Sequence, residues 1–280
     1  PDGNPYAKGT VDPEGIALSP RQTLYISSEG VSRDQIPPFV NEYDLQTGQY
    51  RSRLPIPQRF LPQTLDDQPA GVQDNRGFEA LTLSAVGFSG GQQLEPFRIF
   101  TAPEFGLLQD QPPQPEDSAT ALPPTPIRFL HYLVGVGNNA PSEIISEHLY
   151  DLDLPPEGTR DYGLSELLVL DQAGHFLSLE RSFGLSGFGA KLFQIATGGA
   201  TDTSTLPNLR DSIEGITPIR KELLLDLTTL GLPLDNLEGM TLGPQLPDGS
   251  QSLLLASDDN FNDIQVTQFL LFRLKGWRSQ

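Results

Sequence analysis

The 280-residue chain contains no cysteine, one methionine and one tryptophan. It also lacks any apolar run near the roughly 20 residues that a membrane-spanning helix needs. Without cysteine, a disulfide framework, a thiolate metal site and a cysteine nucleophile are excluded. Basic residues are few: the chain has 18 Lys and Arg but 36 Asp and Glu, which gives a formal net charge of -18. Such a balance disfavours nucleic acid and anionic membranes. We therefore expect no nucleic-acid partner, no membrane insertion, and cations as guests.

Turn-forming residues are plentiful in this chain. It holds 27 Gly and 26 Pro, and only 37% of its residues are hydrophobic. This composition favours many short strands joined by turns, and an all-β fold can run to this length as one domain. We therefore expect a single domain over residues 1–280. Because methionine is scarce and the first residue is Pro1, we also expect an exported protein, periplasmic or secreted, without its targeting segment.

Four segments share one pattern: a carboxylate, a short apolar strand, a tight turn and a second apolar strand, which usually ends at another carboxylate. The first carboxylates are Glu14, Glu79, Glu166 and Glu238, and the second ones are Glu29, Glu104, Glu180 and Asp258. Apolar runs bounded by Gly, Pro, Asn and Asp are typical of β-hairpins. A hairpin returns the chain to the end it left, so both carboxylates of a unit are expected at one sheet edge.

The units are farther apart than the roughly 40–50 residues of one propeller blade, so each interval must hold further strands or loops. Additional strands are expected at 39–44, 49–54, 127–136, 191–196, 221–227 and 265–274. Four strands per blade then give a β-propeller of four to six blades. Ring closure predicts that 265–274 shares a sheet with residues near Tyr6 to Thr10 or with the first repeat.

Six runs together resemble the phytase-like family, also described as "esterase-like activity of phytase". They are Asp12-Pro-Glu14-Gly, Asn75-Arg-Gly-Phe-Glu79-Ala-Leu, Gly163-Leu-Ser-Glu166, Leu224-Leu-Asp226-Leu, Asp235-Asn-Leu-Glu238-Gly-Met and Ser257-Asp-Asp-Asn260-Phe. The resemblance covers nearly the whole chain. It implies a six-bladed β-propeller of the kind found in exported bacterial proteins, including cyanobacterial ones. The activity in the family's name rests on analogy with calcium-dependent propeller phytases, so the catalytic residues remain unassigned.

The four first carboxylates, Glu14, Glu79, Glu166 and Glu238, are the main metal-ligand candidates. Each is expected at or just before the start of an innermost strand, where a Glu contributes little to the fold. Carboxylates that share one channel repel each other unless protons, cationic side chains or a metal offset them. A ligand set of oxygen alone favours Ca²⁺, then Mg²⁺, over Zn²⁺. The alternative is a structural clasp, in which each Glu accepts backbone N–H groups of a neighbouring blade.

The run 258–263 is the densest group of oxygen ligands, so Asp258 and Asp259 join the predicted metal ligands. It is no EF-hand, because Asp263 stands where Gly is needed. A solvated acidic turn remains the alternative.

Four residues near the repeats are predicted to bind a substrate phosphate: Arg76, Arg181, Lys191 and Asn260. For the three cations, pairing with a channel carboxylate is the alternative.

Two further motifs fit the predicted fold poorly. The run 87–91 matches the G-x-S-x-G nucleophile elbow, but Pro96 and a strand follow where a helix is required. The run 135–140 matches a relaxed dinucleotide pattern without alternating strands and helices around it. Both are predicted to be turns.

Three functions remain open from the sequence. The first is a calcium-dependent hydrolase of phosphorylated small molecules. The second is a non-catalytic propeller that binds a protein or glycan partner. The third is a lactonase or esterase, which rests on fold analogy alone.

Overall fold

The computed structural model describes residues 6–84, 95–111, 125–136, 141–210 and 214–275. Their regular structure consists of strands and short 3-10 turns, with no α-helix in these ranges. No helix among them is long and apolar enough to cross a membrane. The predicted all-β class is confirmed. The elbow-like run 87–91 lies outside the described residues, as do residues 137–140 of the dinucleotide-like run.

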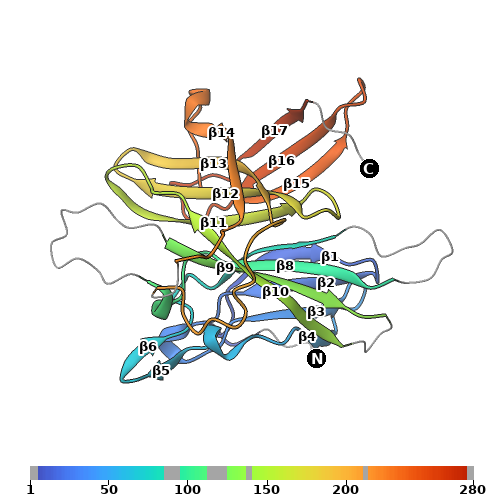
Figure 1. The fold of residues 1–280 in the computed structure, drawn as a ribbon. Coiled ribbons are helices and arrows are strands. Elements are labelled where there is room, and N and C mark those ends of the chain that lie inside the picture. The colour runs from blue at the N-terminus through green and yellow to red at the C-terminus, as the bar shows by residue number, and fades with distance from the viewer. Residues whose placement is uncertain (1–5, 85–94, 112–124, 137–140, 211–213, 276–280) are drawn as a thin grey trace. The chain divides into compact units, whose positions relative to one another are not determined.

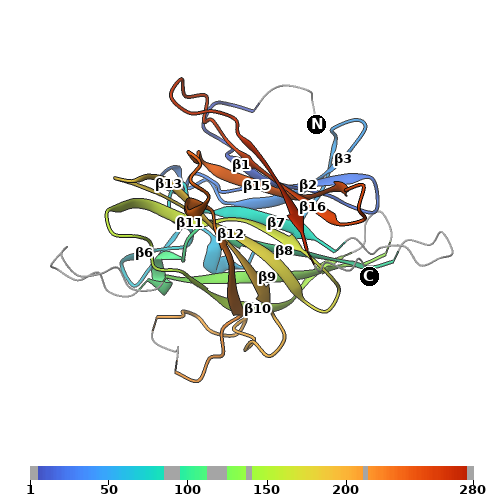
Figure 2. The ribbon, with the colours of Figure 1, turned by 90° about the horizontal axis from the view of Figure 1, so that it is seen from above.

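The fold is a β-propeller whose strands form four antiparallel blade sheets and one small hairpin, with the strands labelled in Figure 1. The first blade holds β1 (Pro13–Leu18), β2 (Thr23–Ser28), β3 (Phe39–Asp44) and β4 (Tyr50–Arg53). The second blade holds β7 (Phe78–Leu83), β8 (Phe97–Pro103), β9 (Thr125–Val134) and β10 (Ser142–Leu152). The hairpin between them pairs β5 (Gln63–Leu65) with β6 (Gln68–Ala70). Figure 2 shows β7 to β10 side by side, in the order of their hydrogen bonding.

The third blade holds β11 (Thr159–Val169), β12 (His175–Gly184), β13 (Gly187–Ala196) and β14 (Arg220–Asp226). The fourth has three strands, β15 (Leu237–Gln245), β16 (Gln251–Ser257) and β17 (Phe269–Leu274). Four 3-10 turns complete the list: η1 (Ser32–Asp34), η2 (Gln58–Phe60), η3 (Leu108–Asp110) and η4 (Leu227–Leu230). Four blades in the described residues meet the lower end of the expected range, and the six implied by the family resemblance are not reached there.

The chain divides into two compact units. Unit 1 comprises 1–154 and 197–220, with the first two blades, and unit 2 comprises 155–196 and 221–280, with the last two. In unit 1, β1 lies beside β7 over a core rich in aromatic rings, such as Tyr25, Phe78 and Phe97. In unit 2, β11 lies beside β15 over a core of leucines and Met240. Packing innermost strand against innermost strand is how blades of a propeller meet. The expectation of one domain over residues 1–280 stays a prediction.

Each innermost strand carries a β-bulge at the repeated motif. The pairing with its hairpin partner shifts between Pro13 and Ile16 in β1, and across Glu79 in β7. It shifts across Ser165 in β11 and across Glu238 in β15. A bulge leaves one residue unpaired and redirects its side chain, which explains how a polar residue fits in an apolar strand. The repeat seen in the sequence is therefore a repeat of bulges.

The additional strands expected from the sequence are confirmed as β3, β4, β9, β13, β14 and β17. The predicted ring closure is wrong in its partner, because β17 pairs with β16 and belongs to the sheet of β15 and β16. The strand β10 was not predicted, since its alternating polar residues give no apolar run. Its open edge is bonded by the segment after β13: Thr203 N donates to the Glu147 carbonyl at 2.7 Å, and Ile219 N donates to that of Leu149 at 2.8 Å.

Candidate metal centre

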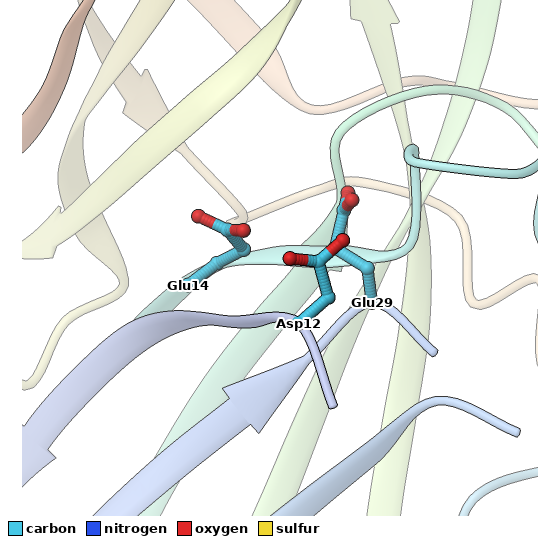
Figure 3. Close-up of side chains that lie close together, drawn as sticks. All are labelled: Asp12, Glu14 and Glu29. Carbon is cyan, nitrogen blue, oxygen red and sulfur yellow. The ribbon is translucent and has the colours of Figure 1, made fainter. Parts of the chain in front are cut away.

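Five carboxylates gather where the first two blades meet, and we call them the acidic cluster: Asp12, Glu14, Glu29, Glu79 and Glu104. Oxygen atoms of Asp12, Glu14 and Glu29 lie within 4.8 Å of one another, and so do those of Glu29, Glu79 and Glu104. Figure 3 shows the carboxylates of the first trio at the adjoining ends of β1 and β2. Glu29 belongs to both groups, so it joins them into one cluster. The prediction that hairpin carboxylates gather at one edge holds for unit 1.

Two glycines allow the strands to come close enough to build this cluster. A Cβ on Gly15, next to Glu14 in the β1 bulge, would lie 2.6 Å from the Glu79 carbonyl oxygen. A Cβ on Gly77, just before β7, would lie 2.2 Å from the carbonyl oxygen of Glu29. Real Cβ atoms do not approach backbone this closely, so any larger residue would push the two blades apart at the acidic cluster.

A serine hydroxyl joins the two innermost strands at the same level. Ser27 Oγ accepts the Gly15 N–H at 2.8 Å and lies 3.5 Å from the Glu79 carbonyl oxygen. In unit 2, Ser165 Oγ in the β11 bulge lies 3.1 Å from the Leu237 carbonyl oxygen at the start of β15. A serine thus contacts the backbone of the neighbouring blade in both units, and the alternative of a clasp made by the glutamates stays a prediction.

Burial and like charge dominate the electrostatics of the acidic cluster. Glu29, Glu79 and Glu104 expose 3%, 6% and 1% of their surface. Burial raises the pKa of Glu29 to about 9, and the negative charges of Glu104, Glu14 and Asp12 add to the rise. Burial also raises the pKa of Asp12, with a further contribution from Asp74. Without a cation, Glu29 therefore keeps its proton at neutral pH.

Glu29 has a carboxylate oxygen without a hydrogen-bond partner among the described residues. Glu29 Oε1 is buried and accepts no hydrogen bond. A buried, unsatisfied carboxylate oxygen is costly, and a bound cation would satisfy it while offsetting the repulsion among the five acids. Ca²⁺ takes six to eight oxygen ligands in flexible geometry, which carboxylates and water supply together. The residues of this cluster therefore fit a hard divalent cation.

In unit 2, two predicted site residues meet as an ion pair. Arg181 Nε lies 3.2 Å from Glu238 Oε1, and Arg181 Nη1 donates to Asp161 Oδ2 at 2.8 Å. Asn236 Nδ2 also donates to Glu238 Oε1, at 2.7 Å. Burial raises the pKa of Glu238, while Arg181 and Asn236 act against the rise. The pairing role that the sequence left open for Arg181 is thus present in the structure.

Glu166, predicted at the start of an innermost strand, lies well inside β11, and that prediction is wrong. Its Oε1 accepts the N–H of the next residue, Leu167, at 2.8 Å. The bulge residue of β11 is Ser165, so the repeated position lies one residue before Glu166. The matching residue of β12 is one place later than expected: Leu164 pairs with Glu180, so Arg181 holds the position of Glu29 and Glu104 in the first two blades.

In the run 258–263, side-chain oxygens accept hydrogen bonds from backbone N–H groups of the same run. Asp258 Oδ1 accepts the N–H of Asn260 at 3.0 Å, and Asp259 Oδ1 accepts that of Phe261 at 2.9 Å. Asn260 is exposed and has a positive φ of 50°. Asp258, Asp259 and Glu166 join no group of three candidate ligands among the described residues. The geometry is that of a solvated acidic turn, with Asp and Asn side chains holding it together.

The other two predicted phosphate-binding cations lie in different units. Arg76, three residues before Glu79, stacks over the ring of Phe105 at 4.6 Å. Lys191 of β13 lies opposite Glu180 in the sheet. Sequence reasoning missed Lys221, whose Nζ donates to Glu180 at 2.6 Å. It also missed Asp12 as a metal-ligand candidate, whereas Glu29 and Glu104, the second carboxylates of their hairpins, are candidates from the sequence, with a solvated acidic turn as the alternative.

Comparison with solved structures finds two similar chains, each 12% identical to this one. The structure is similar to an α-L-arabinanase of Penicillium chrysogenum complexed with arabinobiose, with a TM-score of 0.44 and 12% identity. That match covers 96% of this chain and 63% of the fungal one, so the chain spans less than two thirds of its length. An endo-arabinase of Bacteroides thetaiotaomicron matches with a TM-score of 0.30 and 12% identity, covering 96% of this chain and 95% of that one.

No curated protein matches the chain in sequence. The family model described as "Phytase-like: Esterase-like activity of phytase" matches residues 1–261. This range includes both blades that build the acidic cluster and all four bulged strands. The chain belongs to the phytase-like family.

Proposed function

We propose that this protein is a calcium-dependent hydrolase of phosphate esters on small molecules, which works outside the cytoplasm as a periplasmic or secreted protein. The observation that supports the proposal is the acidic cluster with its unpartnered buried oxygen, Glu29 Oε1. The family description, with its reference to phytase, agrees with this class of reaction. Extracellular calcium sites commonly have dissociation constants on the order of 10⁻⁴ to 10⁻³ M, so an exported protein would meet enough calcium to fill one.

The charge of the cluster makes a cation necessary for this chemistry. Five carboxylates within one site repel a phosphate ester, and the net charge of -18 adds to the repulsion. A bound Ca²⁺ supplies positive charge that attracts the phosphoryl group, polarises its oxygen and activates water. The chain's own contribution is to hold several carboxylates at ligand distance in a water-poor position.

Two arginines of unit 1 are suited to orient the phosphate. Arg76 lies in the loop that leads to Glu79, with its guanidinium over Phe105. Arg33 binds Asp74 at 3.2 Å, and its positive charge acts on Asp12 by opposing the rise of that residue's pKa. Arginine binds phosphate oxygens through two parallel N–H bonds, so either side chain would fix the substrate at the edge of the acidic cluster.

The test is release of phosphate from para-nitrophenyl phosphate, with calcium and with a chelator. We expect turnover only with calcium, and a loss of about 100-fold or more in kcat/KM for Glu79→Gln, because one ligand charge disappears while the shape is kept. Asp67→Asn is the matched control, since it removes the same charge from the exposed β5–β6 turn.

Two results would overturn the proposal. One is calcium-independent turnover that Glu79→Gln leaves unchanged. The other is calcium binding without any phosphatase activity, which would favour a non-catalytic propeller that presents its loops to a protein or glycan. Activity on an aryl acetate or a lactone in place of the phosphate ester would favour the esterase alternative.

A further inference from the structure

Unit 2 has a cavity of about 520 Å³ that no part of the proposed hydrolase uses. We call it the hairpin groove, because its walls are the turn 156–159, the β12–β13 hairpin turn 184–187, and the segment after η4, 232–234. Its volume falls within the roughly 300–1,000 Å³ typical of small-molecule sites. It lies wholly within unit 2, so it is separate from the acidic cluster, which belongs to unit 1.

Close backbone packing builds the groove. The Leu185 N–H donates to the Gly158 carbonyl at 3.2 Å. A Cβ on Gly184 would lie 2.5 Å from that same carbonyl oxygen, and one on Gly189 would lie 2.9 Å from Ser182 Oγ. Four of the lining residues are glycines, which leave backbone N–H and C=O groups uncovered along the walls.

The polar groups of the groove include both donors and acceptors. Ser182 is paired in the sheet through its backbone, but its side-chain hydroxyl forms no hydrogen bond within the described part of the chain, so the hydroxyl is available to a ligand. Thr159 and Thr228 donate their own hydroxyl protons to the Pro156 carbonyl and to Asp226, which leaves their oxygens as acceptors. Glu157 adds an exposed carboxylate at the rim. This mixture suits hydroxyl groups, which both donate and accept.

The groove also has an apolar wall. The Phe188 ring lies against that of Phe183, with centroids 4.6 Å apart. Leu185 is 78% exposed and Leu232 is 50% exposed, so both present apolar surface beside the ring. Among the described residues that line the groove there is no Lys, Arg or His, and the one charged residue is Glu157. An anionic ligand is therefore disfavoured, and a neutral one is favoured.

We propose that the hairpin groove binds a neutral saccharide of one or two units, with one ring face against Phe188 and hydroxyls bonded to Ser182, Thr159 and Glu157. A sugar ring has an apolar face of C–H groups and an edge of hydroxyls, which matches an aromatic wall beside free hydroxyls and backbone groups. This binding goes beyond the proposed hydrolase and requires no metal.

The experiment is calorimetric titration of the whole protein with maltose, cellobiose and xylobiose, in a chelator so that the acidic cluster contributes nothing. We expect saturable binding of at least one of them, and weaker or absent binding of glucose 6-phosphate because of Glu157. Phe188→Ala should weaken the affinity about tenfold, whereas Phe188→Tyr should preserve it. Ser186→Trp, at the exposed turn, should block the groove without touching the core. Leu271→Ala, at an exposed β17 residue outside the groove, is the control.

Three outcomes would refute the inference: no binding of any of the three disaccharides up to about 10 mM, binding that Phe188→Ala and Ser186→Trp leave intact, or equal loss in Leu271→Ala. The hydrolase proposal is judged apart from this one, since Glu79→Gln should abolish phosphatase activity while leaving saccharide binding unchanged.

Discussion

At the scale of single residues, Glu29 is the side chain whose state depends most directly on its neighbours in the acidic cluster. The residue is 3% exposed, lies beside the four other acids of the cluster, and has one oxygen without a hydrogen bond among the described residues. In the metal-free protein it is therefore protonated at neutral pH, whereas in the unfolded chain it is ionised.

This difference gives a pH dependence with a defined sign. Because the folded pKa is about 9 and lies above the usual glutamate value of 4.5, the native state binds the extra proton between these pH values. Stability of the metal-free protein should then fall as pH rises from about 5 to 9. Glu29→Gln keeps the neutral shape, so it should remove part of this decline and stabilise the metal-free protein by on the order of 2 kcal/mol at pH 7.

Urea unfolding in chelator at several pH values measures this effect. Parallel stability curves for the wild type and Glu29→Gln would contradict it. The same variant should lose calcium binding, so a gain in metal-free stability together with a loss of the calcium response distinguishes an electrostatic role from general damage.

At the scale of strands and turns, two backbone contacts set the spacing of the first two blades. Gly77 lies directly against the backbone of Glu29, and Gly15 lies against that of Glu79. Backbone atoms cannot move aside as a flexible side chain can, so these contacts fix the ends of β1, β2 and β7.

Gly77→Ala should therefore destabilise the protein by about 1–3 kcal/mol and weaken calcium binding, since the added Cβ overlaps the Glu29 carbonyl. Gly198→Ala is the matched control, because a Cβ there meets nothing within 4 Å and should change stability by less than about 0.5 kcal/mol. Chemical denaturation and calcium titration measure the two effects. An unchanged calcium affinity in a folded Gly77→Ala protein would show that the glycine contact does not position the ligands.

A buried ion-pair network fixes the segment that follows β13 and covers the edge of β10. Arg128 is fully buried; Nε and Nη2 bond Asp110 at 2.6 and 3.0 Å, and Nη1 bonds Glu147. Asp110 Oδ1 also accepts the Leu209 N–H at 2.8 Å, so the ion pair reaches the covering segment. A buried arginine between two carboxylates holds this segment on the second blade.

Arg128→Met should cost about 3–5 kcal/mol, because it removes the arginine that pairs with buried Asp110 and leaves buried Glu147 with Arg59 alone. Arg98→Met, at an exposed position of β8, should have little effect. Urea unfolding compares the two variants. Similar stability of both would mean that the buried network is electrostatically replaceable by apolar packing.

At the scale of the whole molecule, the net charge of -18 couples folding to cations. If calcium binds the native state only, a hundredfold excess over the dissociation constant stabilises it by about 2.7 kcal/mol. For a chain of this size the melting temperature should rise by about 5 °C with calcium and return with chelator. Differential scanning calorimetry of the wild type, Glu79→Gln and Asp67→Asn tests this.

The rise in melting temperature with calcium should be smaller in Glu79→Gln and unchanged in Asp67→Asn. A melting temperature that changes with neither calcium nor chelator would rule out a stabilising site in the acidic cluster. In that case its carboxylates would have structural partners of their own, alongside the hydroxyl contact that Ser27 makes between the two blades.

The sequence by itself determined the all-β class, the hairpins and the family, because alternating apolar runs and turn residues act locally. It also marked Glu14 and Glu79, since a carboxylate at the start of an apolar strand stands out against its surroundings. The sequence did not determine the register of the bulges. A shift of one residue moves a side chain to the opposite face of the strand, and such a shift puts Ser165 in place of Glu166, and Arg181 in place of Glu180, at the repeated positions.

Only the tertiary structure decided which carboxylates meet. The β1–β2 hairpin brings Asp12 and Glu29 together, but Glu104 reaches them from another blade because Gly15 and Gly77 let the two blades approach to backbone contact. The same close packing buries Glu29 and raises its pKa, whereas Asp258 and Asp259, as acidic in sequence, use their oxygens to bond a solvated turn. Burial and like-charge proximity arise from packing between blades, and the local pattern of residues carries no record of them.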